Sequence, residues 1–310
     1  MPRISVIIPA YNSGPYLDEA VQSVIAQTFT DWECIVVDDG STEDLSRVEK
    51  MDPRVRLLRQ SNAGQAAARN RGLAVAAGEI VSFLDHDDLW PQDRISWAVR
   101  ALRENLDVDA VGGTFTNNLA VIRETVEDGE RIRIDGDAIW WGCPFSSVGQ
   151  VTMRTAAVRD IRGFDADNRG VEDYDLYVRM ARRRAILRVP RLALQFRVHP
   201  GNQSKDAWRM LRAGALCLRR RLPEVPLGRR WRMSRRAYRG LYDLVGREIV
   251  ASMRAGVRGA KAPRTSGWGE FLHWFGPGLA TDPRLAVRFA ADAFLPGQHR
   301  PAPAQDSEGK

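Results

Sequence analysis

Three acidic clusters in this sequence lie next to the ends of expected strands or helices, and one of them has the spacing of a metal site. Asp85-His86-Asp87-Asp88 directly follows the apolar run 80–84. Carboxylates that lie close together beyond a buried strand can converge on one hard cation. Mg²⁺ and Mn²⁺ prefer carboxylate oxygens together with the oxygens of a diphosphate. An acidic turn is the alternative, because Asp is common in turns, and this cluster alone leaves both interpretations open.

The other two clusters are Asp38-Asp39 and Glu172-Asp173. A carboxylate of the first could accept a hydrogen bond from a nucleoside base or a ribose hydroxyl, or could only form an Asx turn into Gly40-Ser41. The second cluster precedes a helical pattern, where a carboxylate caps a helix. Its functional alternative is a general base, which would take the proton of an attacking hydroxyl while a metal ion stabilises a departing diphosphate.

The order of the three clusters adds information that none carries alone. Along the chain come carboxylates suited to a nucleoside, then carboxylates suited to a metal, then a candidate base. His199 follows as a possible ligand or phosphate contact, although a single His is also common in structural roles. This order favours a functional interpretation over two unrelated turns and a helix cap.

The elements around the clusters predict a sheet that brings them to one edge. The β-branched run 4–9 and the apolar run 32–37 indicate strands, and residues 16–27 between them have helical periodicity. Parallel strands joined by a helix place their ligand loops at the carboxyl ends of the strands. The pattern continues with expected strands at 54–59, 79–84, 110–117, 185–189 and 192–198, expected helices at 65–77, 95–105 and 176–183, and an irregular polar segment at 125–136.

Composition and length are those of a globular protein. The chain has 310 residues, of which 44% are hydrophobic and 27% charged, and this excludes a disordered or collagen-like chain. Cys34, Cys143 and Cys217 form no C-x-x-C pair, so we expect buried thiols in a reducing compartment and no zinc site. The N-terminal apolar run is too short for a signal peptide, and no stretch approaches the roughly 20 apolar residues of a membrane span. We therefore expect a cytoplasmic protein.

The sequence becomes Arg-rich after about residue 206, within a net charge of +7. Arg219-Arg220-Arg221 and Arg229-Arg230 occur near Trp231 and Tyr238. A cationic surface with aromatic side chains could lie on anionic lipid at the inner face of the plasma membrane, or could be a solvated face of the protein. No recognised nucleic-acid-binding module accompanies the charge, so we expect no nucleic acid. We expect residues 206–297 to form a mostly helical region and 298–310 a flexible tail.

Several stretches resemble the family 2 glycosyltransferases with the GT-A fold, and the resemblance covers about residues 3–204. In chain order they are Ser5-Val6-Ile7-Ile8-Pro9-Ala10-Tyr11-Asn12, Ser23-Val24-Ile25-Ala26-Gln27-Thr28, Val36-Val37-Asp38-Asp39-Gly40-Ser41-Thr42, Asn62-Ala63-Gly64-Gln65-Ala66-Ala67-Ala68-Arg69-Asn70, Phe83-Leu84-Asp85-His86-Asp87-Asp88-Leu89-Trp90, and Gly163-Phe164-Asp165 through Glu172-Asp173-Tyr174-Asp175-Leu176. The resemblance implies an α/β fold with a Rossmann-like mixed sheet flanked by helices. It further implies a glycosyltransferase domain at 1–205, with a nucleotide-sugar-binding half (1–117) and an acceptor half (118–205).

The resemblance also implies roles for individual residues. Asp173 matches the catalytic base and Glu172 its neighbour at the acceptor. The metal would be bound by Asp87 with Asp85 and the late His199. The residues that match the nucleotide-sugar site are Pro9, Tyr11, Asp38, Asp39, Asn62, Arg69, Asp85 and His86. His86 departs from the family pattern, because a small or acidic residue is more usual inside the D-x-D motif, and it could crowd the site or add a ligand.

These roles describe an inverting, metal-dependent transferase that uses Mn²⁺ or Mg²⁺. It would move one sugar from a nucleoside-diphosphate sugar, UDP-linked in much of the family, to a hydroxyl of a lipid-linked or cell-surface glycan. The chain lacks the Q-x-x-R-W stretch of processive synthases, which favours a single addition. A pyrophosphorylase would need a Gly-rich phosphate loop with Arg or Lys after the first strand, and Pro9-Ala10-Tyr11-Asn12-Ser13 lacks it. A non-catalytic nucleotide-sugar-binding protein of the same fold is the remaining alternative, and the presence of Asp85, Asp87 and Asp173 argues against it.

Overall fold

The computed structural model describes residues 3–119, 129–136, 138–140, 143–199, 202, 206–254 and 267–294. The chain divides into two compact units. The first contains the sheet and extends to Asn202, and the second contains the helices from residue 207 onward together with Trp140. The predicted tail 298–310 lies outside the described residues.

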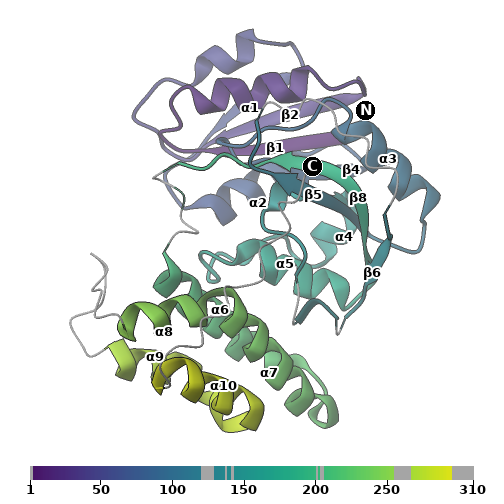
Figure 1. Cartoon of the computed structure of the whole chain (residues 1–310). Coiled ribbons are helices and arrows are strands. Elements are labelled where there is room, and N and C mark those ends of the chain that lie inside the picture. Colours follow the sequence, from purple (N-terminus) through teal and green to yellow (C-terminus); the bar gives the residue numbers. More distant parts are fainter. Residues whose placement is uncertain are drawn as a thin grey trace. The chain divides into compact units, whose positions relative to one another are not determined.

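The first unit is built on one mixed sheet, which has eight strands within the described residues (Figure 1). Their order across the sheet is β3-β2-β1-β4-β7-β5-β8-β6. β7 runs antiparallel to its neighbours β4 and β5, β6 runs antiparallel to β8, and the other neighbouring pairs are parallel. The bounds are β1 Ile4–Ala10, β2 Trp32–Asp38, β3 Val55–Arg59, β4 Ile80–Phe83, β5 Ala110–Thr116, β6 Ile132–Ile134, β7 Val151–Arg154 and β8 Ile186–Gln195.

Register brings the loops that follow β1, β2 and β4 to one edge of the sheet. Ala10 at the end of β1 is level with Asp38 at the end of β2, and Ile7 is level with Phe83 at the end of β4. The three strands are parallel, so their carboxyl ends open in the same direction. The acidic clusters after β2 and β4 therefore share this edge, as the sequence predicts.

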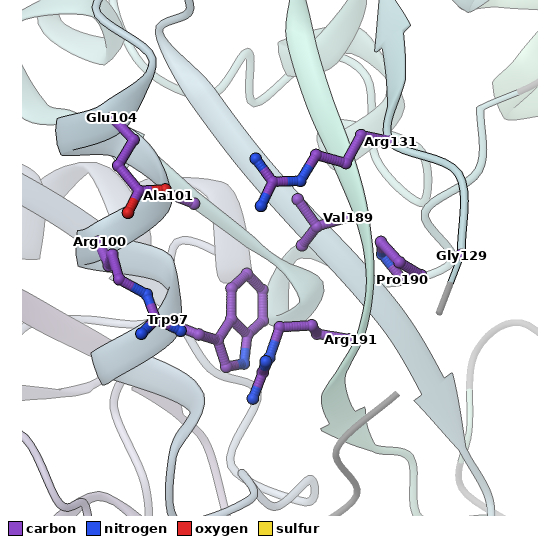
Figure 2. A pocket seen from close by; sticks show the side chains of 9 residues that line it. All are labelled: Trp97, Arg100, Ala101, Glu104, Gly129, Arg131, Val189, Pro190 and Arg191. Carbon is purple, nitrogen blue, oxygen red and sulfur yellow. The ribbon is translucent and has the colours of Figure 1, made fainter. Parts of the chain in front are cut away.

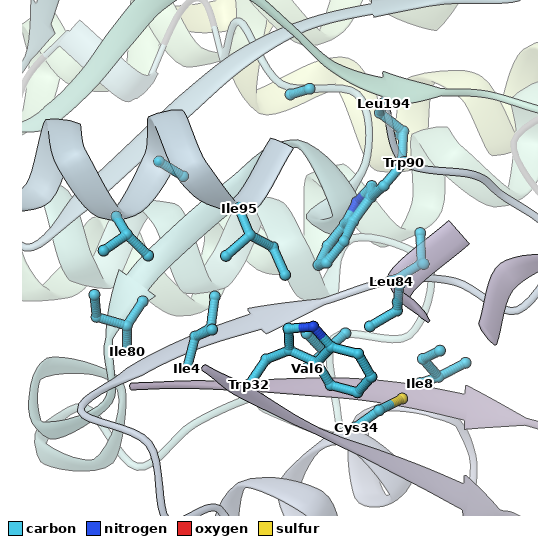
Figure 3. Close-up of a cluster of buried hydrophobic side chains, with 14 of the residues drawn as sticks. Ile4, Val6, Ile8, Trp32, Cys34, Ile80, Leu84, Trp90, Ile95 and Leu194 are labelled. Carbon is cyan, nitrogen blue, oxygen red and sulfur yellow. The ribbon is translucent and has the colours of Figure 1, made fainter. Parts of the chain in front are cut away.

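Helices cover both faces of the central strands, which explains why β1 is apolar at nearly every position. Ile4, Val6 and Ile8 face a core cluster completed by α1 (Tyr16–Ile25) and α3 (Arg94–Glu104) (Figure 3). Ile7 faces the opposite side, where α2 (Gln65–Val75) packs so closely that a Cβ on Gly72 would lie 2.5 Å from Ile7 Cγ2. A strand buried on both faces has a continuous apolar run instead of an alternating one.

Two further α-helices belong to the first unit, α4 (Thr155–Asp160) and α5 (Glu172–Ala181). The sequence predicts α5 four residues later, at 176. The structure begins the helix at Glu172, so the Glu172-Asp173 pair occupies its first turn, where the helix dipole favours negative charge. Neither α4 nor β7 was predicted from the sequence.

β8 is one strand where the sequence predicts two, and Pro190 explains the difference. Gly112 pairs with Arg188 and Thr114 with Leu192, so three residues of β8 face one of β5 in a bulge. Pro190 lies inside this bulge, where residues do not pair in the ladder. A residue without an N–H can therefore occupy this position without the loss of a hydrogen bond between the strands. The segment 125–136, expected to be irregular, contains β6, and residues 125–128 lie outside the described residues.

The second unit is helical, as predicted. Its elements are α6 (Ala207–Arg221), α7 (Leu227–Leu241), a π-helical turn η6 (Tyr242–Gly246), α8 (Arg247–Arg254), α9 (Gly267–Thr281) and α10 (Pro283–Phe294). Phe275 lies at its centre, in ring contact with Tyr238, Tyr242 and Phe271. The buried carboxylate of Asp282 binds Arg235 and Arg239 of α7, and the hydrogen bond from Arg239 is the main reason that the pKa of Asp282 falls to about 2.

Candidate active site

A buried ion pair joins α2 to the loop after β4. Arg69 Nη2 lies 2.5 Å from Asp85 Oδ1, and the Arg69 side chain is 4% exposed. The Arg69 guanidinium also lies over the Phe164 ring, 5.2 Å from its centroid. Phe164 is held in place by α2 itself, because its amide and carbonyl both bond the Asn70 side chain at 2.8 Å. One helix therefore positions both the cation and the loop that leads to α5.

Asp173 and Glu172 lie close enough to this ion pair for their charges to interact with it. Burial raises the pKa of Asp173 to about 6; Glu172 and Asp85 add to the rise, while the Tyr174 amide and Arg69 oppose it. Asp173 Oδ1 accepts the Tyr174 amide at 2.7 Å, and Glu172 Oε2 accepts the Gly170 amide at 2.8 Å. A carboxylate whose pKa is raised toward neutrality is a better proton acceptor than an ordinary Asp, which suits a general base.

Asp87 points to a different partner from Asp85. Its Oδ2 lies 2.8 Å from His199 Nε2, and both side chains are about one fifth exposed. Asp88, next in the chain, is buried; its Oδ1 accepts the Arg197 amide at 3.0 Å, and its Oδ2 has no hydrogen bond. Burial, together with the charges of Asp85 and Asp87, raises the pKa of Asp88 well above its ordinary value. The loop after β4 thus holds three carboxylates with three different sets of partners.

Asp38 and Asp39 are both buried and hydrogen-bonded by the protein. Asp38 Oδ1 accepts the amide of Ser41, three residues further on, at 2.8 Å, and this bond holds the turn through Gly40. Asp39 accepts Gln60 Nε2 at 2.7 Å and the amides of Ala63 and Gly64 at 2.8 Å each. Asp39 therefore fixes the loop that leads into α2 and, through α2, the position of Arg69.

The other predicted nucleotide-sugar residues lie at the same edge with different exposure. Pro9 is buried within β1, Tyr11 is 48% exposed just beyond it, and Asn62 is exposed in the loop before α2. His86 is partly buried in the loop after β4. The structure thus gathers the predicted residues at one edge in separate groups, with Arg69, Asp85, Glu172 and Asp173 in one and Asp87 with His199 in another.

Among the residues that the structure describes, no group of three or more His, Cys, Asp or Glu side chains is arranged to hold a metal ion. The predicted ligands Asp85, Asp87 and His199 are accordingly divided: Asp85 is paired with Arg69, and Asp87 with His199. Two protein ligands fit Mn²⁺ or Mg²⁺ as part of a site, since these ions keep water and phosphate oxygens in their coordination shells.

Residues 5–162 match the sequence profile of the family described as "Glycosyl transferase family 2". The chain belongs to this family. Together with the mixed sheet and the likeness to solved glycosyltransferases, this makes the chain a glycosyltransferase with a GT-A fold, and it confirms the predicted fold class.

Individual relatives agree with the family. The putative teichuronic acid biosynthesis glycosyltransferase TuaG of Bacillus subtilis is 40% identical over 108 residues, which cover 33% of this chain and 43% of that protein. The chain spans less than half the length of the curated relatives that it matches first. Residues 1–349 of S. aureus TarS in complex with UDP-GlcNAc superpose with a TM-score of 0.69 at 19% identity, over 93% of this chain and 84% of that one. The mannosyltransferase PcManGT from Pyrobaculum calidifontis, in complex with GDP-Man and Mn²⁺, gives 0.61 at 21% identity, over 94% and 84%.

Sequence reasoning missed two residues of this glycosyltransferase that contact predicted site residues. Arg197 contacts both Asp87 and Asp88, and Ser147 Oγ lies 3.5 Å from Asp85 Oδ2. Asp88 was noticed only as part of an acidic run. Arg197 could have been found from its place two residues before His199, whereas nothing in the sequence points to Ser147.

Two other features of this glycosyltransferase lie apart from these groups. Phe145 is buried against Tyr177 with ring centroids 5.5 Å apart, so it is a core residue. A cavity of about 250 Å³ lies between α3 and β8 (Figure 2), and none of the predicted site residues lines it. Its lining comprises Trp97, Arg100, Ala101, Glu104, Gly129, Arg131, Val189, Pro190 and Arg191.

No helix in the described part of the chain has the length and apolar character that crossing a bilayer requires.

Proposed function

We propose that this glycosyltransferase moves a single sugar from a nucleoside-diphosphate sugar to an acceptor hydroxyl, with inversion at the anomeric carbon and with Asp173 as the general base. The observation that carries the proposal is the Asp173 carboxyl, with a pKa raised to about 6, beside the Arg69–Asp85 pair. At pH 7 such a group is mostly ionised and accepts a proton more readily than an ordinary Asp. A displacement assisted by one base has a single in-line step, and such a step inverts the anomeric carbon.

The donor half of the proposal rests on the polar groups at the carboxyl edge of β1, β2 and β4. Arg69 supplies a buried cation for a diphosphate, and its Nε makes no hydrogen bond within the protein. Asp85 lies next to it with an oxygen that could accept from a ribose hydroxyl. The side chains proposed to contact the nucleoside and the sugar are Pro9, Tyr11, Asp38, Asp39, Asn62 and His86. UDP-linked sugars are the first donors to test because the TarS complex contains UDP-GlcNAc, and GDP-linked sugars follow because the PcManGT complex contains GDP-Man.

A divalent cation, Mn²⁺ or Mg²⁺, is part of the proposal, with Asp87 and His199 as its protein ligands. The Mn²⁺ in the PcManGT complex supports this choice, as does the partly exposed Asp87–His199 pair. When bound, the ion would stabilise negative charge on the departing diphosphate. Arg69 would neutralise the same charge from the protein side, and Asp173 would accept the proton of the acceptor hydroxyl.

We place the acceptor among cell-surface or lipid-linked glycans. The name of the B. subtilis relative, which refers to teichuronic acid biosynthesis, supports a surface polysaccharide. Leu227 and Trp231 of α7 support contact with a membrane surface at which such glycans are made, because they are 79% and 58% exposed and lie one helical turn apart. Arg235 lies over the Trp231 ring at 4.4 Å, so the exposed apolar pair has a cation beside it.

The experiment that tests the proposed function is a donor screen by nucleotide release. The purified chain is given a panel of UDP-, GDP- and dTDP-sugars with and without Mn²⁺, and is compared with Asp87→Ala and Asp173→Asn. We expect one donor to give metal-dependent release that both substitutions abolish. A different outcome would be that a donor binds tightly, that none of the acceptors tested supports turnover, and that neither substitution changes the background rate of nucleotide release. In that case the chain is a nucleotide-sugar-binding protein and the catalytic proposal is wrong.

A further inference from the structure

The side chain of Arg197 joins three segments that are far apart in the sequence. Its Nε donates to the Asp87 carbonyl at 2.9 Å, in the loop after β4. Its Nη2 forms an ion pair with Glu19 in the first half of α1. Its guanidinium also lies over the Tyr16 ring, 4.6 Å from the centroid. Arg197 itself belongs to the segment after β8, and its side chain is only 15% exposed.

The backbone around Arg197 already holds these segments together without the guanidinium. Leu89 and Gln195 exchange hydrogen bonds of 3.1 and 2.9 Å in an antiparallel bridge, and the Arg197 amide donates to Asp88. The path of the chain therefore does not depend on the Arg197 side chain. What the side chain adds is a fixed position for the Asp87 backbone and for the Tyr16 ring.

The Asp87 backbone and the Tyr16 ring both adjoin the Asp87–His199 pair. The Asp87 carbonyl that receives Arg197 Nε belongs to the same residue whose carboxylate meets His199. The Tyr16 ring that receives the guanidinium also contacts the His199 ring, with centroids 5.4 Å apart. One cation thus fixes the residue on one side of the pair and the aromatic neighbour on the other.

We infer that Arg197, anchored by Glu19, is a positioning residue that sets the relative placement of Asp87 and His199 for a divalent cation. The inference rests on the proposed metal site, and it assigns to the Arg197–Glu19 pair a role in metal affinity that is separate from stability. Groups that orient metal ligands without touching the ion change metal affinity by about 10- to 100-fold when they are removed.

The test measures Mn²⁺ binding directly, by the electron paramagnetic resonance signal of free Mn²⁺, with the full chain alone and with UDP. Arg197→Gln keeps the backbone amide that bonds Asp88 and removes the three side-chain contacts. We expect it to raise the dissociation constant for Mn²⁺ by about 10- to 100-fold. Glu19→Gln should raise it by less. The double variant should match Arg197→Gln alone, because the two side chains act through one contact.

Arg54 offers a matched control. Its guanidinium likewise lies over an aromatic ring, Trp32, at 3.6 Å and pairs with a carboxylate, Asp52, at 2.7 Å. It lies before β3, away from the carboxyl edge of the sheet. We expect Arg54→Gln to lower the melting temperature about as much as Arg197→Gln does and to leave Mn²⁺ affinity unchanged.

The outcomes separate this inference from the function on which it rests. If the unsubstituted chain binds Mn²⁺ and Arg197→Gln binds it equally well, the positioning role is wrong and the proposed metal site stands. If Arg54→Gln weakens Mn²⁺ binding as strongly as Arg197→Gln, the effect reflects general loss of stability and the inference is overturned. If the unsubstituted chain binds no Mn²⁺ with or without UDP, the metal site and the positioning role both fail.

Discussion

Arg69 forms a buried ion pair with Asp85 and at the same time lowers the pKa of Asp173, so one cation connects the residues that we propose for the donor side and for the acceptor side of the site. Burial raises the pKa of Asp173 more than Arg69 lowers it, which leaves the value at about 6. The pKa of the proposed proton acceptor is therefore lowered by the same residue that we propose as the diphosphate contact. Three properties become measurable through this connection: the pH dependence of activity, the effect of Arg69 on it, and the pH dependence of stability.

The first prediction concerns the acidic limb of the pH profile. A base must be ionised to work, so kcat/KM should rise with pH and level off above about 6, the pKa of Asp173. Arg69→Gln removes the cation that opposes the rise of this pKa, so the limb should move to higher pH. The same substitution should lower kcat/KM at least tenfold through the lost diphosphate contact.

Arg71 is the control for this prediction, because it lies on the same helix but is exposed. Arg71→Gln should leave both the limb and the rate unchanged. An acidic limb that stays in place in Arg69→Gln would show that Asp173 does not control it.

The second prediction concerns stability. The pKa of Asp173 is raised from 3.8 to about 6 in the folded protein, so between these values the folded protein holds a proton that the unfolded chain has released. The contribution of Asp173 to the free energy of unfolding is therefore most favourable below pH 4 and falls as the pH rises through about 6. Asp173→Asn removes this dependence, because Asn is neutral and still accepts the Tyr174 amide.

We compare the free energy of unfolding of Asp173→Asn with that of the unsubstituted chain at pH 4 and at pH 8. Between pH 4 and pH 8 we expect this difference to move in favour of the variant by about 1–3 kcal/mol. Urea unfolding at the two pH values measures this difference. An equal difference at both values would mean that the carboxyl titrates normally in the folded state. A more stable but inactive variant is also the usual signature of a residue kept for function.

Much of this site follows from the sequence, because its main features are local. The strand–helix–strand alternation around residues 4–37 predicts parallel strands, and parallel strands carry Asp38 and Asp85 to one edge. The first turn of α5 was also within reach, since acidic residues favour that position. β7 was missed because its four residues are too few to show a period.

The pairing of side chains could not be predicted in the same way. Asp85 and Asp87 differ by two positions in one loop, yet one meets Arg69 and the other meets His199, 112 residues away. Which partner each carboxylate takes depends on how α2 and the end of β8 pack against the loop. Arg197 was missed for the same reason, since its role depends on α1, on the loop after β4 and on the bridge between Leu89 and Gln195.

The third prediction concerns Asp39, whose carboxylate fixes the loop before α2 through three N–H donors. Asp39→Ala leaves these donors without their acceptor and should reduce the free energy of unfolding by about 1–3 kcal/mol. Because the loop leads into the helix that carries Arg69, the KM for the donor should rise as well. Asp44→Ala, at an exposed carboxylate of the same region, should leave both quantities nearly unchanged. An unchanged melting temperature in Asp39→Ala would show that the loop holds its shape without this acceptor.

The last prediction concerns membrane contact through α7. Exposed Leu227 and Trp231 lie one turn apart on this helix, and a Trp with a neighbouring cation suits the boundary between head groups and acyl chains. Vesicles that contain phosphatidylglycerol should bind the chain, and Leu227→Ala/Trp231→Ala should weaken that binding at least tenfold, since burial of each side chain contributes about 1.5–3 kcal/mol. Leu106→Ala, at a leucine of the first unit that is 73% exposed, should bind like the unsubstituted chain. If the double variant binds as tightly as the unsubstituted chain, or if neutral phosphatidylcholine vesicles bind equally well, then α7 does not dock on anionic lipid and its arginines belong to a solvated face.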